Sequence, residues 1–216
     1  MTKSILFDLD GTLTDSGEGI INCAILALEH FGLPVPDRET LRVFVGPPLD
    51  QTFIKFGVPA DKTDEAIKVY RSRYTTIGKF ENFPYPGIAE LLCSLKNQGH
   101  RLFVATSKPE MMSIEILDKF GLSQYFERIC GATLDGSRSK KEDVIAYLLK
   151  EVGSAGNAVM VGDTAYDVIG AAAHGIPTIG VAWGYGQIAD MVSAGASAIA
   201  YSVAELLTFL ENDPLQ

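Results

Sequence analysis

Short apolar runs alternate with helical patterns along most of the chain, and this alternation limits the possible folds more than any other feature. The runs are residues 4–9, 101–106, 128–132, 158–162, 178–181 and 198–201, and the helical patterns cover residues 87–98, 109–120, 140–152, 165–174 and 202–211. Most runs are apolar at successive positions, which suits strands buried on both faces of a parallel sheet. The pattern predicts an α/β fold with a doubly wound, Rossmann-like parallel sheet.

One long segment interrupts the alternation. Between about residues 15 and 79 there is no convincing strand pattern, only short helical ones separated by Gly-Pro turns, and a proline-rich turn at residues 83–87 closes the segment. We expect a small α-helical cap domain, residues 15–81, inserted after the first strand of an α/β core that comprises residues 1–14 and 82–216. A helical insertion there would close over the carboxyl end of the sheet.

The charge balance bears on partners and location. Lysine and arginine number 18 and aspartate and glutamate 27, so the net charge is 18 − 27 = −9. A negative net charge argues against a nucleic-acid partner, because binding to nucleic acid usually needs a basic stripe on the protein surface. The apolar stretch near the start is too short for a signal peptide or a membrane span, so we expect a cytoplasmic protein with no membrane partner, as monomer or homodimer. The three cysteines, Cys23, Cys93 and Cys130, are expected to be reduced core residues.

Two aspartates lie at the end of the first run. Asp8 and Asp10 are two residues apart, so their side chains leave an extended strand on the same side, and Gly11 then permits a sharp turn. Carboxylates so close would repel each other unless a cation lay between them, which points to a divalent metal. A polar loop with an aspartate helix cap is the alternative interpretation.

A second acidic pair, Asp163 and Asp167, stands at the end of another buried run and in the first turn of the next helix. Aspartate at a helix start is commonly a cap. Together with Asp8 and Asp10 at a neighbouring strand end, however, the pair predicts a Mg²⁺ site made of oxygen ligands from two loops.

Hydroxyl groups end the run at residues 101–106. Thr106 and Ser107 precede Pro109, which suits the first position of a helix. Hydroxyls and free amides at a helix start can hold a phosphate, although Ser107 as a simple N-cap explains the segment equally well.

A lysine is expected to face the sheet from the helix at residues 140–152. Ser139 and Glu142 have the spacing of a capping box, which places Lys140 and Lys141 in the first turn, where the helix dipole disfavours cations. The apolar stripe of this helix points in nearly the same direction as Lys141, whereas Lys140 lies about 110° away. Lys141 should therefore reach the strand ends and pair with carboxylates or a phosphate.

In order and spacing, these segments resemble the four motifs of the haloacid dehalogenase superfamily. The matching residues are Asp8-Leu9-Asp10-Gly11-Thr12-Leu13, Thr106, Lys141 and Gly162-Asp163-x-x-x-Asp167, and residues 44–49 resemble the cap segment of its phosphoglycolate phosphatase-like branch. The resemblance implies that Asp8 attacks phosphorus to form an aspartyl-phosphate and that Asp10 acts as general acid and base.

The resemblance also implies the binding groups. Mg²⁺ would be held by Asp8, the main chain of Asp10 and Asp163, with Asp167 binding it or its waters. The phosphoryl oxygens would be held by Thr106, Lys141 and the backbone around Gly11, Thr12 and Ser107. Ser107 departs from the asparagine of many relatives, which leaves this mechanism intact.

The expected function is Mg²⁺-dependent hydrolysis of a small-molecule phosphate ester, resembling that of phosphoglycolate phosphatase. Nucleoside 5′-monophosphate hydrolysis and a phosphosugar mutase of the β-phosphoglucomutase type are the alternatives within the superfamily. A receiver-type signalling domain also phosphorylates an aspartate beside Mg²⁺, but such a module is about half this length and carries its acidic groups on separate strands. A catalytically inactive binding protein would not need every one of these chemical positions.

Overall fold

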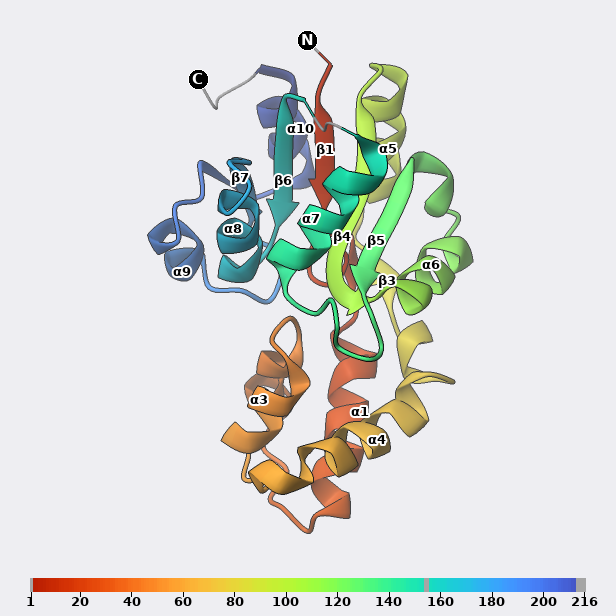
Figure 1. Cartoon of the computed structure of the whole chain (residues 1–216), viewed down its shortest axis with the longest axis vertical. Helices are drawn as coiled ribbons and strands as arrows, with labels where there is room; N and C mark the ends of the chain where they lie inside the picture. The colour runs from red at the N-terminus through yellow and green to blue at the C-terminus, as the bar shows by residue number, and fades with distance from the viewer. Residues whose placement is uncertain (1, 154–155, 213–216) are drawn as a thin grey trace. The chain divides into compact units, whose positions relative to one another are not determined.

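The computed structural model describes residues 2–153 and 156–212 and divides into two compact units (Figure 1). One unit combines the chain up to Thr14 with the chain from Pro84 onward, and the other is Asp15–Phe83. The first is an α/β unit and the second is helical.

A six-stranded parallel sheet forms the centre of the α/β unit. Its strands are β1 (Ser4–Phe7), β4 (Arg101–Pro109), β5 (Arg128–Ala132), β6 (Ala158–Gly162), β7 (Thr178–Val181) and β8 (Ala198–Ala200), in the order β5-β4-β1-β6-β7-β8. The chain builds outward from β1 to β5 on one side and then from β6 to β8 on the other. The reversal at β1 creates a topological switch point, and in such sheets ligands bind at the carboxyl ends of the strands there. The predicted doubly wound sheet is confirmed.

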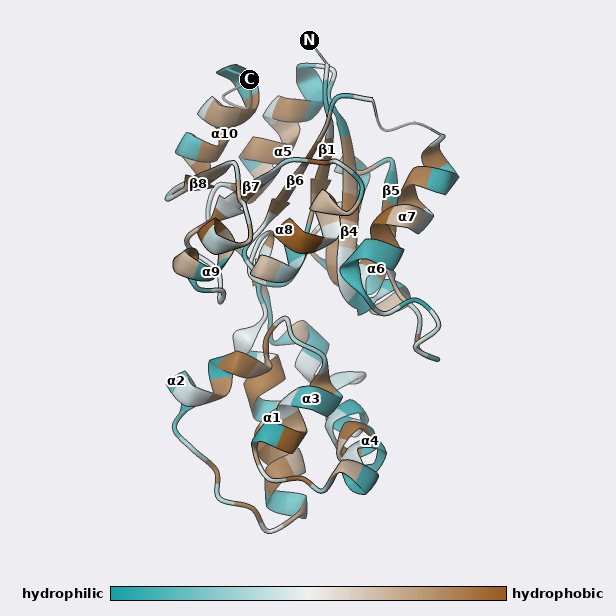
Figure 2. Ribbon diagram, turned by 60° about the vertical axis from the view of Figure 1, so that its left-hand side comes forward, coloured by the Kyte–Doolittle hydropathy of each residue, from teal (hydrophilic) through white to brown (hydrophobic). Residues whose placement is uncertain are grey.

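Helices cover both faces of this sheet. α5 (Ile88–Asn97), α6 (Glu110–Lys119) and α10 (Val203–Asn212) contribute to one core cluster, and α7 (Lys141–Val152) and α8 (Ala165–Ala172) to the other; α9 (Ile188–Ser193) packs against α8. Successive strand residues enter opposite clusters: Ile5 and Phe7 face the first and Leu6 the second. Figure 2 shows the consequence, with hydrophobic residues concentrated along the strands. This two-sided burial explains why the strand runs are apolar at successive positions.

Several local expectations differ from the structure. β4 continues through Pro109, so Pro109 precedes α6 instead of opening it, and Ser107 does not cap that helix. α7 begins at Lys141 with Lys140 in the N-cap position, so the predicted Ser139 cap is wrong. α9 was not predicted, because its six residues lie among glycines and alanines with little periodicity. Cys23 and Cys130 are buried and reduced, but Cys93 is exposed on α5.

The helical unit is built around two packed helices. Its elements are α1 (Gly17–His30), α2 (Arg38–Leu41), η1 (Arg42–Phe44), α3 (Leu49–Lys55), η2 (Ala60–Lys62), α4 (Thr63–Tyr74) and η3 (Gly78–Phe80), and the chain passes through two short paired strands, β2 (Thr14–Asp15) and β3 (Phe83–Pro84). α1 packs against α4, and a bidentate ion pair of Arg73 with Glu81, at 2.6 and 2.7 Å, secures the end of the unit. Among the described helices, none is both long and apolar enough to cross a membrane.

Candidate active site

The first part of the site lies at the carboxyl end of β1. The N–H of Asp8 still donates to the carbonyl of Val161 at 2.9 Å, so strand pairing fixes the backbone up to Asp8. The chain then turns at Gly11, whose φ of 83° is unfavourable for other residues. The amides of Gly11 and Thr12 donate inside this turn, to the carbonyls of Thr14 and Leu9. Asp8 is buried and Asp10 half-buried.

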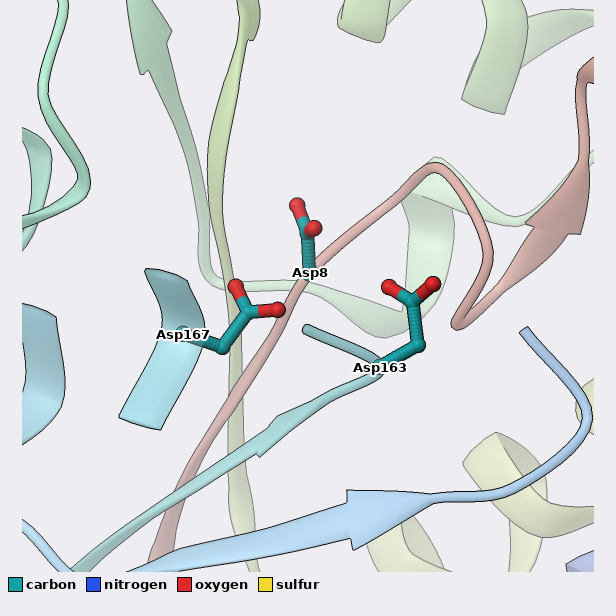
Figure 3. Close-up of side chains that lie close together, drawn as sticks. All are labelled: Asp8, Asp163 and Asp167. Carbon is teal, nitrogen blue, oxygen red and sulfur yellow. The ribbon is translucent and has the colours of Figure 1, made fainter. Parts of the chain in front are cut away.

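Three carboxylates gather where β1 and β6 end (Figure 3). Asp8, Asp163 and Asp167 each place an oxygen within 4.8 Å of the others, and all three are buried. Asp163 accepts hydrogen bonds from the amide of Tyr185 at 2.8 Å and from the hydroxyl of Thr12 at 3.3 Å. The structure therefore brings together the two acidic segments that lie some 155 residues apart in the sequence (163 − 8 = 155).

The sequence left two roles open for Asp167, a helix cap and a member of the acidic site, and its two oxygens make the contacts of both. Its Oδ2 accepts from the amide and hydroxyl of Thr164 at 3.0 and 2.8 Å, as a cap does. Its Oδ1 points into the cluster, where it lies 2.7 Å from the ammonium of Lys141. One carboxylate thus anchors α8 and belongs to the site.

Glycines surround Asp163 on three sides. A β-carbon on Gly11 would lie 2.2 Å from Oδ2 of Asp163, one on Gly184 would lie 2.3 Å from its Cβ, and one on Gly186 would lie 2.0 Å from its carbonyl oxygen. Real β-carbons do not approach other atoms so closely, so we call Gly11, Gly184 and Gly186 the glycine collar. The turn after β1 and the loop after β7 can approach Asp163 this closely only because these positions lack side chains.

Lys141 joins the acidic cluster to the sheet. Its ammonium lies 2.8 Å from Oδ1 of Asp8 and donates to the carbonyl of Ala105 at 2.9 Å, in addition to its contact with Asp167. Lys141 therefore faces the sheet, as the helical periodicity indicated, while Lys140 is exposed beside Glu142. Burial by itself would lower the pKa of Lys141, but the charges of Asp167 and Asp8 outweigh it and raise the pKa.

The end of β4 supplies two more polar groups. Thr106 is buried, and its hydroxyl accepts from the amide of Lys108 at 3.2 Å. The same hydroxyl helps to lower the pKa of Asp8 against the larger effect of burial. Ser107 between them is half-buried. The ammonium of Lys108 lies 2.5 Å from Oδ2 of Asp10, a contact that the sequence analysis missed. The sequence offers no signal for this contact, because the pairing of β4 with β5 is irregular between Ala105 and Pro109.

The charges in the site are unbalanced. With all four carboxylates ionised, Asp8, Asp10, Asp163 and Asp167 contribute −4, and Lys108 and Lys141 contribute +2, so the formal sum is −4 + 2 = −2. Burial raises the pKa of Asp8 to about 6, although Lys141 opposes this, and burial also raises the pKa of Asp163 well above its usual value.

These carboxylates are therefore costly to ionise without a further cation. A divalent cation with a preference for oxygen ligands would supply the missing charge, so the residues fit Mg²⁺. Asp10 lies outside the three-carboxylate cluster. Its Oδ2 faces Lys108, and its Oδ1 is buried with no hydrogen-bond partner in the part of the chain that the structure describes.

A doubly wound sheet with buried aspartates and lysines at its switch point is typical of α/β enzymes, which bind their ligands at this edge of the sheet. The comparison with protein families makes the assignment specific: residues 5–181 match the haloacid dehalogenase-like hydrolases. The chain belongs to this family. Membership of this family rules out the alternative that the chain is a receiver-type signalling domain.

Relatives that span nearly the whole chain carry different names. A 5′-nucleotidase of Pseudomonas aeruginosa is 40% identical over 211 residues, which are 97% of this chain and 96% of the relative. The tyrosine-protein kinase PtkA of Mycobacterium tuberculosis is 44% identical over 203 residues, 94% of this chain and 69% of PtkA. A phosphoglycolate phosphatase of Caulobacter vibrioides is 30% identical over 94% of this chain and 88% of the relative.

Among solved structures, a predicted phosphatase from Clostridium acetobutylicum is similar throughout. The TM-score is 0.94 at 43% identity, and the match covers 98% of this chain and 99% of the other. The fold described above is therefore shared in full with that protein.

Proposed function

We propose that this phosphatase hydrolyses the phosphate monoester of a small metabolite through an aspartyl-phosphate on Asp8. The observation that carries the proposal is the buried cluster of Asp8, Asp163 and Asp167 at the switch point of the sheet, with Lys141 between two of its members. A nucleophile held beside a cation site and a fixed ammonium suits attack on a doubly charged phosphoryl group.

Mg²⁺ is the cation that we propose for this cluster. Asp8 and Asp163 would hold it with the main chain of Asp10, and Asp167 would bind it directly or through water. When bound, Mg²⁺ would screen the charge of the nucleophile from that of the phosphoryl group and stabilise developing negative charge. The net charge of −2 at the site and the raised pKa values of Asp8 and Asp163 support a divalent ion.

We propose two chemical steps for these carboxylates. A carboxylate oxygen of Asp8 would form a bond to phosphorus while the ester P–O bond breaks, and Asp10 would give its proton to the departing alkoxide. A water would then attack phosphorus, Asp10 would take the proton of that water, and the Asp8–phosphorus bond would break to release inorganic phosphate.

The phosphoryl oxygens need donors during both steps. Thr106 and Lys141 border Asp8 and would supply a hydroxyl and an ammonium, and Ser107 would add its amide or hydroxyl. The turn at Gly11 and Thr12 would form the remaining wall. Since the hydroxyl of Thr12 donates to Asp163, we expect Thr12 to act also by orienting that ligand.

A nucleoside 5′-monophosphate is the first substrate to test. The relative named 5′-nucleotidase is 40% identical and matches end to end, whereas the phosphoglycolate phosphatase is 30% identical. We propose 2-phosphoglycolate as the next candidate. We also propose that the helical unit, inserted between β1 and α5, serves as a cap that selects the leaving group.

The test is phosphate release across a panel of esters. Nucleoside 5′-monophosphates, 2-phosphoglycolate and hexose phosphates would be compared with Mg²⁺ or EDTA, for wild type, Asp8→Asn and the exposed control Asp143→Asn. We expect Mg²⁺-dependent release that Asp8→Asn abolishes and Asp143→Asn retains. Conversion of a hexose phosphate to an isomer without phosphate release would instead indicate a mutase, and no turnover of any ester would contradict the proposal.

Tyrosine phosphorylation is a second candidate, because the chain is 44% identical to PtkA. It would require transfer of a phosphoryl group from a nucleoside triphosphate to a tyrosine hydroxyl. Incubation with γ-labelled ATP and a tyrosine-containing peptide tests this candidate: label on tyrosine supports the kinase. An unlabelled tyrosine, with a protein that releases phosphate from the monoester panel, supports the hydrolase alone.

A further inference from the structure

A bulge at the end of β4 changes the direction of its last side chains. Ala105 pairs with Cys130 and Pro109 with Ala132, so four steps on β4 face two steps on β5 and two residues of β4 are extra. Bulges redirect side chains and often lie beside active sites. Here the bulged segment carries Lys108.

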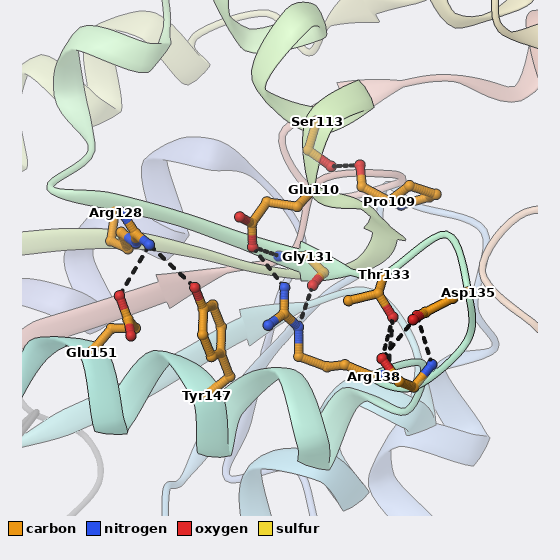
Figure 4. A network of polar contacts seen from close by, with 11 residues as sticks. Pro109, Glu110, Ser113, Arg128, Gly131, Thr133, Asp135, Arg138, Tyr147 and Glu151 are labelled. Atoms are coloured by element: carbon orange, nitrogen blue, oxygen red, sulfur yellow. Dashed lines mark hydrogen bonds and ion pairs between the residues drawn. The ribbon is translucent and has the colours of Figure 1, made fainter.

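Side chains from α6 and from the loop before α7 brace this bulge (Figure 4). Glu110 accepts from the amide of Gly131 at 3.1 Å, and Arg138 donates both to the carbonyl of Gly131 at 2.8 Å and to Glu110 at 2.9 Å. On the other side, the hydroxyl of Ser113 donates to the carbonyl of Pro109 at 3.1 Å. The network holds the two strands where their pairing is irregular.

Gly131 also makes room for the bulge. A β-carbon there would lie 2.5 Å from the carbonyl oxygen of Lys108 and 2.7 Å from the backbone of Glu110. The backbone that carries Lys108 is therefore fixed by β5, by α6 and by the loop before α7. A side chain on so rigid a support is well suited to hold a neighbour in place.

Lys108 uses this support to reach Asp10. Its side chain is only 5% exposed and that of Asp10 13%, and the ammonium lies 2.5 Å from Oδ2. The other oxygen, Oδ1, is buried and has no hydrogen-bond partner among the described residues. An ammonium buried to this degree is costly unless it is paired, so the contact restrains both side chains.

We propose that Lys108 is a positioning residue: it holds Oδ2 of Asp10 and leaves Oδ1 available for proton exchange with the ester oxygen and the attacking water. This inference rests on the proposed function, because it requires Asp10 to act as acid and base. Each buried lysine of the site thus has its own carboxylate partners: Lys108 contacts Asp10, and Lys141 contacts Asp8 and Asp167.

The test compares two esters that differ in their need for a proton. An alkyl leaving group, such as that of the nucleoside 5′-monophosphate, must be protonated as it departs, whereas 4-nitrophenolate leaves without a proton. Because kcat/KM reports on the steps up to the departure of the first product, it isolates this proton transfer. The variants are Lys108→Met, Lys108→Arg, Asp10→Asn and the double variant, with exposed Lys140→Met as the control.

We expect Lys108→Met to lower kcat/KM for the alkyl ester about tenfold or more and for 4-nitrophenyl phosphate less than about threefold, with kcat affected more than KM. Lys108→Arg should recover most of the activity, and Lys108→Met should add nothing in the Asp10→Asn background. Lys140→Met should match the wild type. Circular dichroism would confirm folding, and Lys108→Gln serves if Lys108→Met does not fold.

Three outcomes would overturn parts of this reasoning separately. Equal losses on both esters would mean that Lys108 binds the phosphoryl group and does not act through Asp10. An unchanged kcat/KM for the alkyl ester would remove Lys108 from the reaction. A wild type that releases phosphate from neither ester would contradict the proposed function itself.

Discussion

Removing the ammonium of Lys141 should destabilise the fold far more than removing that of its neighbour. The side chain of Lys141 is 4% exposed and touches Asp8 and Asp167, whereas that of Lys140 is 75% exposed and lies 3.6 Å from Glu142. Lys141→Met and Lys140→Met make the same chemical change one residue apart, so the pair is internally matched.

The magnitude follows from what Lys141→Met leaves behind. Loss of one partner of a buried ion pair costs about 3–5 kcal/mol, because a buried carboxylate stays unpaired. The carbonyl of Ala105 also loses its donor. Proton uptake by Asp8 limits the cost, since its pKa is already raised to about 6 by burial and rises further without Lys141. We therefore expect a loss of about 3 kcal/mol for Lys141→Met and less than about 0.5 kcal/mol for Lys140→Met.

The assay is urea unfolding in EDTA, followed by far-UV circular dichroism and by the fluorescence of Trp183, the single tryptophan. The cost of Lys141→Met should shrink as the pH falls from 8 to 6, because the folded variant binds more protons in that range than the folded wild type. Equal costs for the two variants, or a cost below about 1 kcal/mol for Lys141→Met, would refute the idea that Lys141 balances buried charge.

Three further results are expected. Mg²⁺ at about 100 times its Kd should raise the free energy of unfolding of the wild type by about 2.7 kcal/mol, and EDTA should reverse this; no shift would contradict the cation site. Gly184→Ala should weaken Mg²⁺ binding about tenfold in calorimetric titration, because the new methyl group would overlap Asp163. An unaltered affinity would show that the loop after β7 moves to make room for the methyl group. A double-mutant cycle for Arg138 and Glu110 should give a coupling of about 1 kcal/mol, against less than about 0.5 kcal/mol for the exposed pair Arg128 and Glu151; equal couplings would argue against a bracing role.

The parts of the site that follow regular geometry could be predicted from the sequence. Asp8 and Asp163 end apolar runs, and parallel strands bring such ends to one edge of a sheet. Lys141 lies on the buried face of a helix, and a rotation of 100° per residue was enough to separate it from Lys140. Both arguments need only periodicity, which the sequence displays directly.

The parts that depend on irregular backbone could not be predicted. Lys108 reaches Asp10 because of a bulge, and the sequence does not show that β4 and β5 lose register. The amide of Tyr185 binds Asp163, and every residue has an amide, so no residue type signals the contact. The same holds for the glycine collar, since a glycine is needed there only because segments distant in sequence meet.

The position of β1 has a consequence for how the protein is made. Ser4 pairs with Arg101 on one side and with Ala158 on the other, at sequence separations of 101 − 4 = 97 and 158 − 4 = 154 residues. At about 5–20 residues per second, a ribosome needs roughly 8–30 s to extend the chain from the first of these residues to the last. Throughout that time β1, whose four residues are all buried in the folded protein, has an unpaired edge, so it is the segment for which we expect the greatest dependence on chaperones during synthesis.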